Sequence, residues 1–178
     1  MFYKIKKSIL SFYISMNVNS ALRQGMFFGI NSGVITTTGV IAGLSQATIN
    51  PYIIIITIIS LALSDGLGES YGLYISKKAE KPSDDSNNPL LSLSGLLLMK
   101  VSVVLSFLIP FMFSMSTKYF KNLVWPFTWG IFLLTIMDYR LSKLRDEPIY
   151  TYLIPHYVII IFVVLITKFF GQVLSKHS

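Results

Sequence analysis

Two carboxylates inside an apolar stretch are the residues with the clearest chemical potential in this chain. Asp65 and Glu69 lie four positions apart within residues 51–74, where they are the only charged side chains. That spacing places both on one face of a helix, where ionised carboxylates repel each other. In lipid such a pair requires a neighbouring cation, water or a bound proton. The pair therefore predicts a site that handles a metal ion or a proton.

The preceding apolar stretch, residues 26–48, carries neutral oxygen atoms that could complete such a site. Asn31, Ser32 and Thr36 lie near its middle. Carboxylate, amide and hydroxyl oxygens favour hard cations such as Mn²⁺, Mg²⁺, Ca²⁺ or Fe²⁺ over softer metals. We expect the two carboxylates to be metal ligands and proton acceptors, with these three side chains as neutral ligands. The alternative is that the acids lie near lipid headgroups or pair with Lys100.

Small residues recur every four positions along both apolar stretches. Such stripes allow helix backbones to approach closely in lipid. We expect the two helices to pack tightly, either against each other or across a homodimer. The positions predicted to form these contacts are Gly25, Gly29, Gly33, Ser64, Gly68 and Gly72.

The composition sets the class of protein that must position these residues. Of 178 residues, 53% are hydrophobic and 13% are charged, and soluble domains carry about 25% charged residues. The apolar runs are continuous, whereas the strands of a membrane β-barrel alternate. The chain lacks cysteine and has two histidines, so it has no thiolate metal site and no pattern typical of an enzyme. We predict an all-α integral membrane protein that is not an enzyme.

Five segments reach the ~20 apolar residues that one membrane span needs. A basic stretch with interleaved aromatic residues, 1–24, precedes them and is typical of an amphipathic helix in the headgroup layer, although a solvated tail fits as well. We therefore divide the chain into this N-terminal segment and a five-helix membrane domain, 25–178. The predicted spans are about 26–48, 51–74, 96–115, 123–141 and 153–174.

The distribution of Lys and Arg predicts the orientation in the bilayer. With five spans, the N-terminus and the two longer loops share one side, which holds most of the basic residues and should be cytoplasmic. An error of one span would move the C-terminus to that side. We attribute the net charge of +7 to orientation and lipid contact and expect no nucleic-acid partner. The basic residues of this side are Lys4, Lys6, Lys7, Arg23, Lys77, Lys78, Lys81, Arg140, Lys143 and Arg145.

Three charged residues in the later segments are possible gates or counter-ions. Lys100 lies in the third segment, and its ammonium would exclude a metal if it capped the two acids. Asp138 and Arg140 lie at the predicted cytoplasmic end of the fourth segment. They would form either a gate or a surface pair, and we favour the surface pair.

Residues 25–80 resemble the first two helices of the vacuolar iron transporter family. The family's first helix carries a Gly-x-x-Asp-Gly-like element and then Val-x-Thr, and residues 29–36, GINSGVIT, stand in that place. Its second helix carries Ser-Met-x-x-Gly-Glu, which residues 64–69, SDGLGE, match. Residues 166–171 are similar to the family's last helix. In this chain Ser32 replaces the family's aspartate and Asp65 replaces its methionine.

The resemblance implies a homodimer of five-helix protomers that exports Fe²⁺ or Mn²⁺ from the cytosol in exchange for protons. The acidic cytoplasmic metal-binding domain of some family members has no room here, because residues 81–88 are too few. The carboxylate has in effect moved from the first helix to the second. Two outcomes follow from this change: transport with altered metal selectivity, or a structural or assembly protein that keeps the fold without transport.

Overall fold

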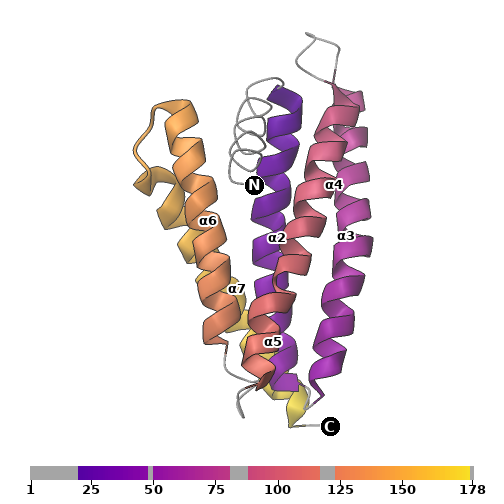
Figure 1. The fold of residues 1–178 in the computed structure, drawn as a ribbon, viewed down its shortest axis with the longest axis vertical. Helices are drawn as coiled ribbons and strands as arrows, with labels where there is room; N and C mark the ends of the chain where they lie inside the picture. The colour runs from indigo at the N-terminus through magenta and orange to yellow at the C-terminus, as the bar shows by residue number, and fades with distance from the viewer. Residues whose placement is uncertain (1–19, 48–49, 81–87, 117–122, 177–178) are drawn as a thin grey trace, which may run out of the picture.

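The computed structural model describes residues 20–47, 50–80, 88–116 and 123–176. These residues form helices and no strand, which confirms the all-α prediction. Figure 1 shows them as a bundle of long helices running side by side. The helices are α2 (Ser20–Ala47), α3 (Pro51–Ala79), α4 (Pro89–Ser106), α5 (Leu108–Ser116), α6 (Val124–Arg145) and α7 (Tyr150–Ser175).

Four helical stretches are long and apolar enough to cross a membrane: α2, α3, α7 and the continuous run Pro89–Phe113. Helix α2 has 28 residues, or about 42 Å at 1.5 Å per residue, which exceeds the ~30 Å hydrocarbon core. Most of the large side chains of α3 and α7 are exposed and apolar, as contact with lipid requires. Length and composition thus fit a multi-pass membrane protein.

The predicted fourth span, 123–141, lies in α6, which is not among these four stretches. Helix α6 is less apolar because Asp138 and Arg140 interrupt its second half. The five-span count and the cytoplasmic N-terminus therefore stay predictions. Most of the predicted N-terminal amphipathic segment, residues 1–19, lies outside the described residues, and residues 20–24 form the first turn of α2.

The same two-residue signal begins α3 and α4. Asn50 caps α3 by accepting a hydrogen bond from the backbone N–H of Tyr52, and Pro51 is the first helical residue. Asn88 caps α4 by accepting from the N–H of Leu90, and Pro89 follows it. Asparagine satisfies an N–H that has no partner inside the helix, and proline needs none at that position.

Two helix boundaries differ from the predicted ones. The sequence places the start of the third span at residue 96 or as early as Leu90, and helix α4 begins at Pro89, where Asn88 supplies the cap. Helix α7 begins at Tyr150, three residues before the predicted span, and Pro155 is its sixth residue. Because that position lies beyond the four N–H groups that have no partner, the proline costs α7 one backbone hydrogen bond.

Helix α2 is the centre of the bundle and contacts α3, α4, α6 and α7. It packs most closely against α4, parallel to it, through the glycine stripe. A Cβ at Gly25 would overlap the carbonyl oxygen of Ser92, and one at Gly29 would lie 2.6 Å from that of Leu96. These glycines therefore allow the close approach that the sequence predicted, but the partner is α4 rather than α3.

The predicted stripe on α3 makes no such contact within the protomer. A Cβ added at Gly68 or Gly72 would meet nothing within 4 Å, and Ser64 is exposed with its hydroxyl donating to the carbonyl of Ser60. The packing prediction is therefore wrong for these positions inside one protomer. Helix α7 meets α2 through other glycines, since a Cβ at Gly171 would overlap the carbonyl oxygen of Gly43.

The apolar core collects side chains from all these helices. Fully buried residues include Val34 of α2, Ile58 of α3, Val104 of α4, Leu134 of α6 and Ile160 of α7. This core holds α3 and α6 on different sides of α2 and α4. The buried charged side chains consequently form two separate clusters, one between α3 and α4 and one between α6 and α7.

Candidate functional site: two buried charge clusters

The side chain of Lys100 lies between the two predicted metal ligands. Its ammonium nitrogen is 2.5 Å from Oδ2 of Asp65 and 2.6 Å from Oε2 of Glu69. The lysine side chain is fully buried, whereas 28% and 29% of the two acidic side chains are exposed. Helix α4 thus brings a cation to the acidic face of α3, the position where a metal was predicted.

Helix α2 contributes one hydroxyl to this cluster. Ser32 donates a hydrogen bond of 2.8 Å to Oε2 of Glu69, the same oxygen that contacts Lys100. Gly29 and Gly33, on either side of Ser32, face α4. We call Ser32, Asp65, Glu69 and Lys100 the lysine cluster. It joins three consecutive helices, α2, α3 and α4.

The lysine cluster is unbalanced in charge. With all groups ionised, two carboxylates face one ammonium, so the formal charge is −1. Among the described residues, Glu69 has two polar partners, Lys100 and Ser32, while Asp65 has one, Lys100. The ionised cluster therefore carries one negative charge that its lysine does not balance, and Asp65 is the acid with the fewer contacts.

The other predicted neutral ligands do not point to this cluster. The hydroxyl of Thr36 donates to the carbonyl oxygen of Ser32, one turn earlier in α2. Asn31 lines a different cavity, together with His156 of α7, and its Oδ1 is a buried atom without a hydrogen-bond partner. Neighbouring helix positions differ by about 100°, so Asn31 and Ser32 face different sides of α2. Among the described residues, no group of three acidic, histidine or cysteine side chains could hold a metal ion.

Asp138 forms a second buried charge pair that the sequence did not reveal. Its side chain is completely buried, and its Oδ1 lies 2.7 Å from Nδ1 of His156. The expected surface pair of Asp138 with Arg140 is therefore wrong for Asp138, and Arg140 is half-buried. We call Asp138 and His156 the histidine pair; it connects α6 to α7.

The histidine pair could have been found from the hairpin that joins α6 to α7. Both residues lie nine positions from Glu147, which is in the turn, and antiparallel helices bring such residues together. The turn itself is held by Asp146 at φ 54°, where a left-handed residue ends α6. Thr135 and Tyr157, whose hydroxyl oxygens are 2.8 Å apart, make a second polar contact between the same two helices.

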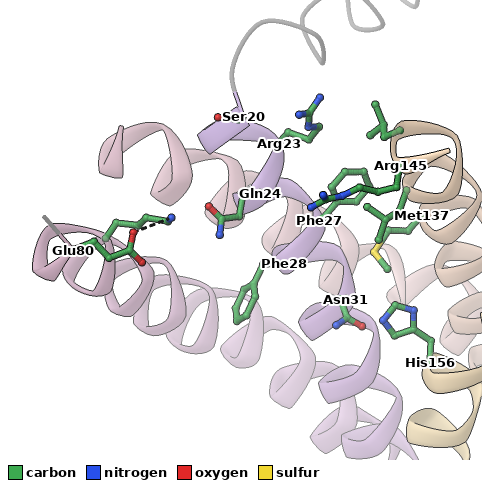
Figure 2. A pocket seen from close by; sticks show the side chains of 13 residues that line it. Ser20, Arg23, Gln24, Phe27, Phe28, Asn31, Glu80, Met137, Arg145 and His156 are labelled. Atoms are coloured by element: carbon green, nitrogen blue, oxygen red, sulfur yellow. Dashed lines mark hydrogen bonds and ion pairs between the residues drawn. The ribbon is translucent and has the colours of Figure 1, made fainter. Parts of the chain in front are cut away.

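A polar cavity of about 800 Å³ opens beside the histidine pair (Figure 2). In the figure Asn31 and His156 lie at one end and Arg23, near the start of α2, at the other. Arg145 extends from the end of α6 into the same cavity. The cavity therefore gives His156, which is 15% exposed, a polar environment at the end of the bundle that we predict to be cytoplasmic. The lining residues include no part of the lysine cluster.

Comparisons with known proteins find no match: no family model, no curated protein and no solved structure is similar to this chain. The resemblance to the vacuolar iron transporter family therefore stays a prediction, together with the metal, proton and homodimer that it implied.

Proposed function

We propose that this chain is a structural or assembly protein of a membrane, and that it does not carry a divalent metal at the Asp65–Glu69 pair. The single observation behind this proposal is the position of the Lys100 ammonium between the two carboxylates. A divalent ion at the same oxygens would lie within contact distance of that buried positive charge, and like charges at low dielectric repel strongly. The lysine thus fills the role that the sequence assigned to a metal.

The contacts of the lysine cluster fit a role in holding helices together. Lys100 and the two acids join α4 to α3, Ser32 adds α2, and Gly25 and Gly29 bring α2 within backbone contact of α4. An intramembrane charge is costly unless it is paired inside the protein. Pairing of this kind favours one arrangement of the three helices over others. A structural or assembly protein, which we call a scaffold, requires such a fixed arrangement.

A second candidate function is the exchange of Mn²⁺ or Fe²⁺ for protons that the family resemblance implies. It is favoured by the exposure of Asp65 and Glu69, which are 28% and 29% accessible although their partner is buried. Exposed carboxylates could bind an incoming ion if the ammonium moved away. In that mechanism Lys100 would be an internal competitor of the metal.

Metal flux into proteoliposomes separates the two functions. The full chain is reconstituted with an internal metal indicator and an inside-acid pH gradient, and Mn²⁺ and Fe²⁺ are compared with Ca²⁺ and Mg²⁺. The variants are Lys100→Gln, which removes the internal cation, and Asp65→Asn with Glu69→Gln, which removes both acids. Empty liposomes give the background, and melting temperature shows that each variant is folded.

The scaffold proposal predicts that wild-type flux equals the background for all four metals. Gradient-dependent Mn²⁺ or Fe²⁺ flux that the double variant abolishes would overturn it and support the exchanger. Binding of Mn²⁺ by Lys100→Gln but not by the wild type would show that the lysine is what excludes the metal.

A further inference from the structure

A groove on the outside of the bundle ends at the lysine cluster. It has a volume of about 610 Å³ and lies between α3 and α7 with α2 as its floor. We call it the α7 groove; it is lined by Thr36, Gly39, Val40, Gly43, Leu44, Ala47, Thr57, Leu61, Asp65, Val163, Thr167, Phe170, Gly171 and Leu174. Its size lies within the range of roughly 300–1,000 Å³ that is typical of small-molecule sites.

The wall of the α7 groove is apolar despite its three threonines. Each threonine hydroxyl donates to a backbone carbonyl of its own helix: Thr36 to Ser32, Thr57 to Ile53 and Thr167 to Val163. Their hydroxyl hydrogens are therefore already used, and the walls contribute mainly carbon atoms. Glycines at positions 39, 43 and 171 make the floor shallow, because α2 and α7 touch there through their backbones.

Among the described residues that line the α7 groove, Asp65 alone is ionisable. It is also the acid of the lysine cluster with the fewer contacts, since Glu69 receives both Lys100 and Ser32. The formal charge of −1 on the cluster is thus presented to a groove whose other walls are apolar. A positive charge entering this groove would neutralise the cluster in a medium of low dielectric, where the attraction is strong.

We propose that the α7 groove binds a lipophilic monovalent organic cation, with its charged centre at Asp65 and its apolar body along α7. A lipid acyl chain would fill the volume but would leave the charge of the cluster uncompensated. A divalent metal would find a single carboxylate in the groove, and no three-residue metal group exists among the described residues. A ligand with an apolar body and one positive charge would match both the apolar wall of the groove and the negative charge of the lysine cluster.

The test uses the full chain in detergent micelles and two ions of nearly identical shape. Tetraphenylphosphonium is a lipophilic cation and tetraphenylborate is its anionic counterpart; binding of each is measured by equilibrium dialysis. We expect the cation to bind saturably and the anion to bind at least roughly tenfold more weakly, because Asp65 attracts one and repels the other.

Two variants locate the site. Asp65→Asn should weaken cation binding at least roughly tenfold, while Lys100 keeps Glu69 as a partner so that the fold survives. Thr57→Phe should weaken it by filling the groove without altering charge. Ser60→Phe is the matched control, because Ser60 is exposed on the same helix but does not line the groove. Melting temperatures confirm that all three variants are folded.

Equal binding of the cation and the anion, or unchanged cation binding by Asp65→Asn, would overturn the proposal and indicate that the groove accepts any hydrophobic molecule, such as an acyl chain. Loss of binding when a higher detergent-to-protein ratio converts the protein to a monomer would also overturn it, because the groove would then belong to an interface between two copies. This proposal does not depend on the scaffold function, since metal flux and binding of the organic cation are measured separately.

Discussion

The lysine cluster and the histidine pair neutralise buried charge in opposite ways. In the lysine cluster the cation is fully buried and the two acids are partly exposed beside an apolar groove. In the histidine pair the acid is fully buried and its histidine partner borders a polar cavity. The ammonium of Lys100 is therefore closed to water, whereas the imidazole of His156 borders a cavity that water can enter.

The largest expected effect comes from Lys100→Met. It leaves two carboxylates four residues apart without their cation, and breaking a buried ion pair typically costs about 3–5 kcal/mol. The control is the triple variant Lys100→Met with Asp65→Asn and Glu69→Gln, which removes the repulsion as well and should recover most of the loss. Thermal unfolding in detergent measures both. If Lys100→Met has the same melting temperature as the wild type, the lysine cluster does not stabilise the bundle.

The next largest effect comes from the close contact between α2 and α4 at Gly29, beside the lysine cluster. In Gly29→Leu the new Cβ would lie 2.6 Å from the carbonyl oxygen of Leu96 and 3.1 Å from the nitrogen of Lys100. Forcing α2 from α4 should cost about 1–3 kcal/mol. Gly68→Leu is the matched control, because nothing lies within 4 Å of that position. Equal melting temperatures for the two variants would contradict the α2–α4 contact.

Asp138→Asn should have a smaller effect on stability. The amide oxygen of asparagine can still accept a hydrogen bond from His156, so we expect a loss of about 1 kcal/mol, the usual value of one hydrogen bond. Thermal unfolding at constant pH measures it. A loss as large as that of Lys100→Met would mean that the histidine pair, rather than the lysine cluster, is the main electrostatic contact of the bundle.

Chemical labelling should separate the two regions without changing stability. An imidazole-reactive reagent such as diethyl pyrocarbonate should modify His156 through the polar cavity, whereas an amine-acetylating reagent should leave Lys100 unmodified. Lys78 is exposed and is the internal positive control for the second reagent. Peptide mapping by mass spectrometry identifies each site. Acetylation of Lys100 at the rate of Lys78 would contradict its burial.

The sequence predicted where the helices lie in the chain better than it predicted which helices contact each other. Continuous apolar runs and the four-residue spacing of Asp65 and Glu69 were enough to place both acids on one face of a helix, and Lys100 was correctly named as a possible partner. The glycine stripe predicted close packing but not the helix that it contacts, because small residues carry no information about their partner. Asn31 was grouped with Ser32 from sequence proximity, although a helix turns them to different sides.

The order of the helices along the chain has a consequence for biogenesis. Helix α3 carries two acids, but their ammonium partner belongs to α4. During synthesis α3 emerges first, and each charge at the centre of an inserted helix costs roughly 2.5–3.5 kcal/mol as judged by the translocon. Lys100 enters only with the following segment, and residues 81–87 separate the two helices. Stable insertion of α3 should therefore wait for α4, so that the two helices leave the insertion machinery as a pair and a chain truncated before Lys100 is retained or degraded.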